Sequence, residues 1–337
     1  MKKKYFFIII IKFGYTTIFA QDKKWVSNRP DSHAPISVMG DHYHSKGEIM
    51  FSYRFMSMNM SDNLQSSKSI SDNDIFNDYM VAPQNMQMQM HMLGAMYAPS
   101  DKLTVMLMAN YLSNIMDSQS SMGSQFTTKS QGFGDSSIAL LYNFFKSNSH
   151  SLHTNVGLSI PTGSISKTDN TPMMNNVKLA YQMQLGSGTW DPFIGLTYLG
   201  QSNSFSWGGQ TIYKVRPSKN KYNYKQDNSL TTTGWGAIKV SNSVSLSTSL
   251  SYSKLNKIQG NDEDFNPMMM PLFNTANSGN QKLDAGLGLN YFTYKGGLKN
   301  LRFGAEIKKT IFQKVNGIQM KYNYIAVLGI QYVLGHK

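Results

Sequence analysis

Four side chains near the N-terminus have the types and spacing of a metal site. They are His33, Asp41, His42 and His44, in the stretch SHAPISVMGDHYHSKGE. In an extended chain, the spacing of His42 and His44 places both imidazoles on one side. Imidazole with a nearby carboxylate is a suitable donor set for copper or zinc. Two other interpretations of this segment stay open: a solvated polar leader, and a plug on the periplasmic side.

Methionine is the second unusual feature, with 23 residues in a chain of 337. In NMQMQMHMLGAMY, every second residue from Met86 to Met92 is a methionine. Such alternation separates into two faces in a strand but not in a helix. Methionine-rich surfaces suit varied apolar ligands, and the thioether together with imidazole selects Cu(I). Three roles therefore remain: ordinary apolar filling, a lining for apolar ligands, or a path for a soft metal.

Patterns typical of enzymes are missing from the sequence. The chain has no H-E-x-x-H, P-loop, G-x-S-x-G or complete G-x-G-x-x-G motif. It also has no cysteine, which excludes thiolate metal sites and cysteine nucleophiles. We therefore predict that the protein is not an enzyme and needs no cofactor, with copper or zinc as the only candidate ions.

The elements that must position these residues are β-strands. In VSLSTSLSYS (244–253), apolar residues alternate with serine, and KLDAGLGLNY (282–291) alternates in the same way. Twelve such stretches are present, and short and long connections between them alternate along the chain. No stretch of 18 apolar residues occurs. The pattern predicts an all-β fold, a transmembrane antiparallel up-and-down β-barrel of about 12 strands, with short periplasmic turns and long outer loops. A secreted sandwich or propeller is the alternative.

In a barrel, the polar side of each strand should face the lumen, because a charge at the lipid midplane costs about 2–4 kcal/mol. This rule turns Gln87, Gln89 and His91 inward and sends the methionines from Met86 to Met92 to lipid. Charged residues on the inner sides would form the constriction. The residues predicted to line the lumen or transport path are Glu48, Arg54, Met56, Met58, His91, Met106, Met108, Asp284, Arg302, Glu306 and Lys308.

The N-terminal sequence MKKKYFFIIIIKFGYTTIFAQ has a positive start, a short apolar core and a small residue at Ala20. It predicts a cleaved signal peptide over residues 1–20. A polar periplasmic leader over 21–46 and the outer-membrane barrel over 47–334 would follow. The net charge of +13 fits contact with anionic lipid headgroups. Without a dense basic cluster, we expect no nucleic-acid partner.

Several segments resemble one bacterial family. They are SHAPISVMGDHYHSKGEIMFSYRFMSMNM, YMVAPQNMQMQMHMLGAMYAPSDKLTVM, LSIPTGSI and MQLGSGTWDPFIGLTYLGQ. They are similar to outer-membrane transporters of the phenol-degradation meta-pathway type, in a methionine- and histidine-rich branch. The resemblance covers nearly the whole mature chain and implies a channel in the outer membrane of a Gram-negative bacterium. It also implies passage of small hydrophobic or aromatic compounds, and it carries no binding residues over.

We therefore expect an outer-membrane channel or transporter for small molecules, with membrane lipids and the solute as its partners. The alternative is a methionine- and histidine-rich outer-membrane protein that handles copper or another heavy metal. The sequence leaves open the solute, the direction of transport and the oligomeric state.

Overall fold

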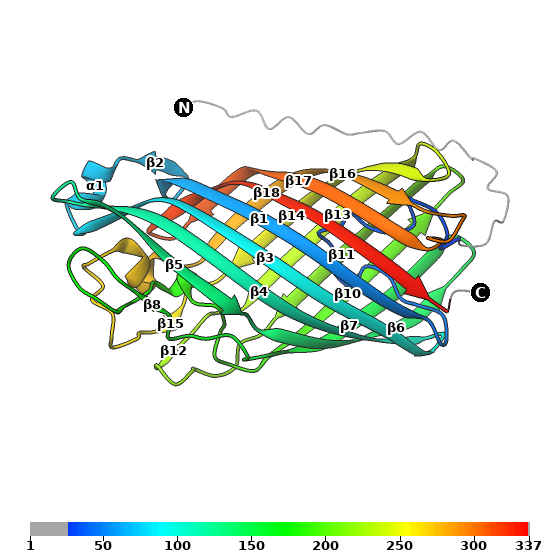
Figure 1. Cartoon of the computed structure of the whole chain (residues 1–337), viewed down its shortest axis with the longest axis horizontal. Coiled ribbons are helices and arrows are strands. Elements are labelled where there is room, and N and C mark those ends of the chain that lie inside the picture. The colour runs from blue at the N-terminus through cyan, green and yellow to red at the C-terminus, as the bar shows by residue number, and fades with distance from the viewer. Residues whose placement is uncertain (1–25, 336–337) are drawn as a thin grey trace, which may run out of the picture.

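The computed structural model describes residues 26–335, so the predicted signal peptide lies outside the described residues. Twelve strands follow one another around a single closed antiparallel barrel (Figure 1). They are β1 (Ile49–Gln65), β3 (Val81–Ser100), β4 (Leu103–Ser120), β6 (Ser136–Lys146), β7 (His150–Ile160), β10 (Asp191–Gln201), β11 (Phe205–Lys214), β13 (Ser229–Lys239), β14 (Val244–Leu255), β16 (Asn280–Phe292), β17 (Leu301–Val315) and β18 (Ile318–Leu334). Pairing of β1 with β18 closes the sheet. The predicted barrel of about 12 strands is confirmed.

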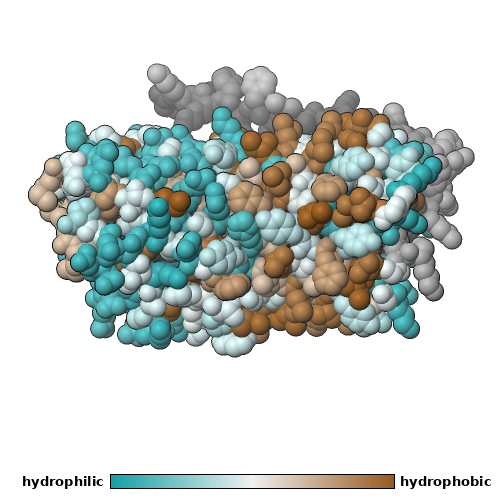
Figure 2. Space-filling model, viewed as in Figure 1, coloured by the Kyte–Doolittle hydropathy of each residue, from teal (hydrophilic) through white to brown (hydrophobic). Residues whose placement is uncertain are grey.

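No helix in the described range 26–335 is long and apolar enough to cross a membrane. The outer wall instead carries large apolar side chains that protrude from alternate strand positions, such as Leu93, Leu287 and Leu328. These residues form an apolar belt, which Figure 2 shows over the half of the molecule nearer the C-terminus. Leu287 is 68% exposed, and no second layer of residues 26–335 covers the outside of this sheet. Lipid is therefore the solvent that this belt fits.

One end of the barrel holds the start of β1, the end of β18 and the short turns. By the sidedness of outer-membrane barrels this is the periplasmic end. At the other end, β1, β3 and β4 project beyond the apolar belt, where β2 (Lys68–Ile70) and β5 (Gln125–Phe133) pair with β1 and β4. The polar segments 61–85 and 117–134 lie between the alternating stretches of the sequence and fit the expected outer loops, but much of both segments is strand. The strands there extend beyond the lipid, so polar residues occupy both of their faces. The sequence of these parts therefore lacks the alternation of apolar and polar residues.

The inward side of β3 differs from the prediction. Met56 of β1 is paired with Met90 of β3, and Phe55 is paired with His91. Directly paired residues share a face, and Met86 and Met96 are almost fully buried. The methionines therefore face the lumen, while His91 is exposed on the outer wall. The rule that polar residues face inward failed here because this part of β3 lies at the border of the apolar belt, where the outer face is already polar.

The long outer loops pack against one another over the outer end of the barrel. Short pairs of strands tie them, β8 (Thr168–Asp169) with β9 (Val177–Lys178) and β12 (Tyr224–Lys225) with β15 (Gln259–Gly260). Buried apolar residues from loops and strand ends form one cluster: Met60, Val81, Met86, Met116, Leu179, Ala180, Met183, Met270, Leu272 and Met320. Lys178 adds ion pairs to Asp262 (2.6 Å) and Asp264 (2.8 Å). The outer end is thus capped by a small core of its own.

The orientation of β3 is testable with single cysteines, because the chain has none. Gln89, paired with Ser57 and Ser113 on the polar part of the outer wall, should react as a cysteine with a membrane-impermeant maleimide on intact cells. Cysteine at Leu93, on the same face but within the apolar belt, should be protected. Labelling at Met88→Cys with none at Gln89→Cys would show that the register is inverted.

Candidate functional site

The segment before β1 lies inside the barrel (Figure 1). We call residues 29–44 the plug. The carbonyl oxygen of Gly40 accepts hydrogen bonds from His153 Nε2 (3.0 Å), Asn155 Nδ2 (3.2 Å) and Gln210 Nε2 (3.3 Å). These donors belong to β7 and β11 on the lumen wall. The described part of residues 21–46 is therefore a plug and not a solvated polar leader. This corrects the prediction of a separate leader in the periplasm.

Charged residues of the wall hold the plug at several points. Arg302 is 3% exposed, and its guanidinium donates to the carbonyl oxygens of Pro30 (2.7 Å) and Arg29 (2.9 Å). The Glu306 carboxylate accepts from the backbone N–H of Ser37 (3.0 Å). Arg54 lies 3.2 Å from the sulfur of Met39. Charged hydrogen bonds of this kind are stronger than neutral ones, so these wall residues bind the plug rather than lining an open constriction.

The other predicted charges lie elsewhere in the lumen. Glu48 is buried beside the plug, where it accepts a hydrogen bond from the backbone of Ser45 (3.0 Å). Asp284 pairs with Lys282, and Lys308 donates to Ser251 (3.2 Å), deeper in the barrel and away from the plug. All the predicted charges are on the inside of the barrel, but the structure divides them into two groups.

Two glycines make room for the plug. Gly304 of β17 and Gly329 of β18 are directly paired. A Cβ atom at Gly304 would lie 2.9 Å from Ile36 Cβ, and one at Gly329 would lie 2.7 Å from Ile36 Cγ1. Both distances are shorter than real Cβ contacts, so any larger residue would displace Ile36 or the wall. The sequence analysis did not predict this contact of Ile36 with the two glycines. Its only signal was glycine at inward positions of two neighbouring strands.

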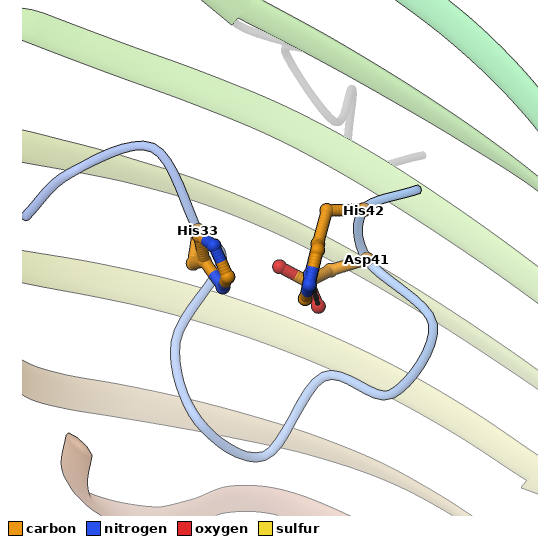
Figure 3. Close-up of side chains that lie close together, drawn as sticks. All are labelled: His33, Asp41 and His42. Carbon is orange, nitrogen blue, oxygen red and sulfur yellow. Dashed lines mark hydrogen bonds and ion pairs between the residues drawn. The ribbon is translucent and has the colours of Figure 1, made fainter. Parts of the chain in front are cut away.

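The predicted metal-site residues come together in the plug. The carboxylate of Asp41 accepts from Nδ1 of His42 (2.8 Å), and Glu48 accepts from Nδ1 of His44 (3.2 Å). The rings of His33 and His42 are 3.8 Å apart, and those of His42 and His44 are 4.9 Å apart. Figure 3 shows His33 facing Asp41 and His42 across a turn of the plug.

Three ring nitrogens of this cluster have no hydrogen-bond partner among residues 26–335. They are His33 Nδ1, His42 Nε2 and His44 Nε2, and all three are buried. An unsatisfied buried polar group costs about 1–3 kcal/mol. Burial, with the charge of Arg302 next in importance, lowers the pKa of His33 well below its ordinary value. Burial also lowers the pKa of His44 against the opposing effect of Glu48. The neutral imidazoles that result are the form that binds metals.

Methionines form rows across the inner face of β1, β3 and β4. At the periplasmic end, Met50 is paired with Met96, and Met96 with Met106. Further along, Met56 is paired with Met90 and Met58 with Met88, and the last row of Met60, Met86 and Met116 reaches the outer cap. Met108 lies on the same inner face of β4, next to Met106. The predicted lumen position of Met56, Met58, Met106 and Met108 agrees with this geometry. The predicted lumen position of His91 does not, because this residue lies on the outer wall. Its Nδ1 is 2.8 Å from the hydroxyl of Tyr53 on the outer wall.

A cavity of about 520 Å³ lies between the plug and the outer cap. Its apolar lining includes Met39 of the plug, Met90, Met106, Met108 and Leu112. Its polar lining includes Thr233 of β13 and Ser251 of β14, which the strand order places across the barrel from β3 and β4. Lys214, Arg216 and Lys308 bring positive charge to it, and Asp135 and Asp191 bring negative charge. The cavity is therefore apolar on one wall and polar on the other.

Comparison with solved structures finds the same fold in an outer membrane channel. An outer membrane channel of Pseudomonas putida F1, named COG4313, is 15% identical and has a TM-score of 0.58, with 88% of this chain and 99% of that chain covered. The transport unit of the autotransporter AIDA-I from Escherichia coli is 9% identical with a TM-score of 0.49, covering 88% and 93%. A FadL homologue of Pseudomonas aeruginosa is 9% identical with a TM-score of 0.42, covering 85% and 90%.

No curated protein sequence matches the chain. Residues 77–322, most of the barrel, match the family described as "Putative MetA-pathway of phenol degradation". The Pseudomonas putida channel is an outer-membrane protein with the same fold, and the closed barrel with its apolar belt agrees with the predicted localisation in the outer membrane of a Gram-negative bacterium. The chain therefore belongs to the family described as "Putative MetA-pathway of phenol degradation", and its fold is that of an outer-membrane β-barrel.

Proposed function

We propose that this protein is a channel for small amphipathic molecules with an apolar, aromatic-sized body and a polar or anionic group. The observation that carries the proposal is the two-sided cavity. Methionine rows supply an apolar wall, and the flexible methionine side chain adapts to ligands of different shape. Lys214, Arg216 and Lys308 supply charge on the polar part of the lining. The phenol-degradation description of the family supports the same class of solute.

In this proposal the protein is a passive channel and not an enzyme. A pocket that is mostly apolar with a few placed polar groups is the usual form of a small-molecule site. Here the site lies midway along the barrel. The plug, which polar wall residues hold, is on one side of it, and the cap of apolar loops is on the other. A solute would have to pass both, so the plug and the cap set the rate of passage.

A second candidate is a path for a soft metal such as Cu(I), because thioether sulfur is a ligand for that ion. The observation that favours it is that every row of paired inward positions across β1, β3 and β4, from Met50 to Met60, contains at least one methionine. His91, the predicted imidazole partner, lies outside the barrel and takes no part in this path.

The two candidates differ in what they need from methionine. Replacing Met90 and Met108, which line the cavity, by leucine keeps the wall apolar and removes the sulfur. We expect flux of a small aromatic acid into proteoliposomes to change little in the leucine variant. The corresponding Met→Gln variant should lose flux several-fold, because it makes the wall polar. A leucine variant that keeps aromatic flux but loses copper transport would favour the second candidate, and equal flux in all variants would contradict a role for this wall.

Release of the plug should raise conductance. Arg302→Ala removes the guanidinium that donates to the backbone of Arg29 and Pro30, so we expect a several-fold larger single-channel conductance, with more frequent switching between levels. Lys299→Ala is the matched control, because Lys299 is an exposed cation in the turn before β17 at the same end of the barrel. Identical conductance of both variants and the parent protein would show that Arg302 does not hold a gate.

A further inference from the structure

The histidine cluster has a use beyond solute passage. We propose that His33, His42 and His44 bind a divalent transition-metal ion, Zn²⁺ or Cu²⁺, and that Asp41 and Glu48 are positioning residues for two of these ligands. The ligand atoms are the three buried nitrogens without a partner among the described residues, His33 Nδ1, His42 Nε2 and His44 Nε2. The inference does not depend on which solute the channel passes.

The hydrogen bonds fix which nitrogen of each ring is available. Asp41 accepts from Nδ1 of His42 and Glu48 accepts from Nδ1 of His44, so each Nε2 carries its lone pair. A metal-bound histidine usually donates its other ring nitrogen to a carboxylate in this way. Possible ligand atoms of His33, Asp41 and His42 lie within 4.8 Å of one another, and the ring of His44 lies 4.9 Å from that of His42. Side-chain movements would bring the three imidazole nitrogens to one ion.

The charge around the cluster is balanced. Arg302 and Arg54 lie close enough to His33 to repel a cation. Asp41 and Glu48 offset them. The carboxylate of Asp41 also accepts a hydrogen bond from the backbone N–H of Ala34 (2.9 Å). The two carboxylates therefore place negative charge beside the imidazoles and can support a cationic centre.

An entry path is present. A cavity of about 250 Å³ borders His33, His42 and His44, and its lining extends to Lys146 and Asn300 beside the periplasmic turns. An ion can thus reach the cluster from the periplasmic end without crossing the methionine-lined cavity. Imidazole donors suit Zn²⁺ and Cu²⁺, whereas Mg²⁺ and Ca²⁺ prefer oxygen.

The consequence of binding is a tighter plug. His33 lies on one side of the turn that contains Ile36 and Gly40, and His42 lies on the other (Figure 3). A bound ion would join the two ends of this turn and hold it against the lumen wall.

The test is titration of the purified full-length barrel with ZnCl2 and with CuCl2, by calorimetry. We expect the parent protein to bind one ion per chain. The double variant His33→Ala/His42→Ala should show no binding at the metal concentrations that saturate the parent protein. Asp41→Asn should weaken binding by about 10–100-fold, the usual effect of losing such a carboxylate. His91→Ala is the control, because it removes an imidazole from the outer wall. Equal binding by the parent and the double variant, or loss in His91→Ala alone, would overturn the proposal.

A measurement on the parent protein avoids dependence on the folding of variants. With Cu²⁺ bound, the electron paramagnetic resonance spectrum should show coupling to at least two imidazole nitrogens. Binding should also raise the midpoint of thermal unfolding as the Cu²⁺ concentration increases. A spectrum with oxygen ligands alone would contradict a histidine site.

Discussion

Closure of the sheet between β1 and β18 is the constraint on which the rest of the structure depends. A strand in lipid has no water for its backbone groups, so every edge must be paired. The pairing from Ile49 with Leu334 to Gln65 with Ile318 meets this need. Closure also gives each strand one lipid face and one lumen face. Large apolar residues such as Leu93 and Leu287 can then be exposed on the outside, and the inside must accommodate what cannot face lipid.

Charged side chains therefore point into the interior, where they need hydrogen-bond partners. Arg302, Glu306 and Arg54 are buried on the inner wall. The plug supplies carbonyl oxygens, a backbone N–H and a thioether to them. In return, the wall supplies donors to the plug, as His153 does to Gly40. The plug and the wall are complementary in hydrogen bonding, and the glycine pair at 304 and 329 makes them complementary in shape.

Much of the fold could be predicted from the sequence, because alternation in strands such as 244–253 is a direct consequence of a wall with two environments. The inward placement of Arg302 and Glu306 followed from the same rule. The rule failed at β3, where polar residues on the outer face and methionines on the inner face reversed the usual pattern. It could not show that the leader enters the barrel, since contacts such as Arg302 with Pro30 join residues far apart in the chain. The sequence shows how many residues separate His33 from His42, but it does not show that their rings meet. The turn at Gly40, whose φ is +60°, brings the rings together.

The central claim is that the plug occupies the lumen and is seated on the glycine pair. The most direct measurement is disulfide formation between cysteines at Ile36 and Gly304 in outer membranes under mild oxidation. A Cβ atom at Gly304 would lie 2.9 Å from that of Ile36. The smaller side chain of Ile36→Cys gives space to the cysteine at position 304, and a shift of roughly 1 Å brings the two Cβ atoms to disulfide distance. A seated plug predicts rapid, nearly complete cross-linking, seen as a mobility change on a non-reducing gel, and little cross-linking when the second cysteine is at the outward Phe303. No cross-link at Gly304, or equal cross-linking at Phe303, would contradict a plug held in the lumen.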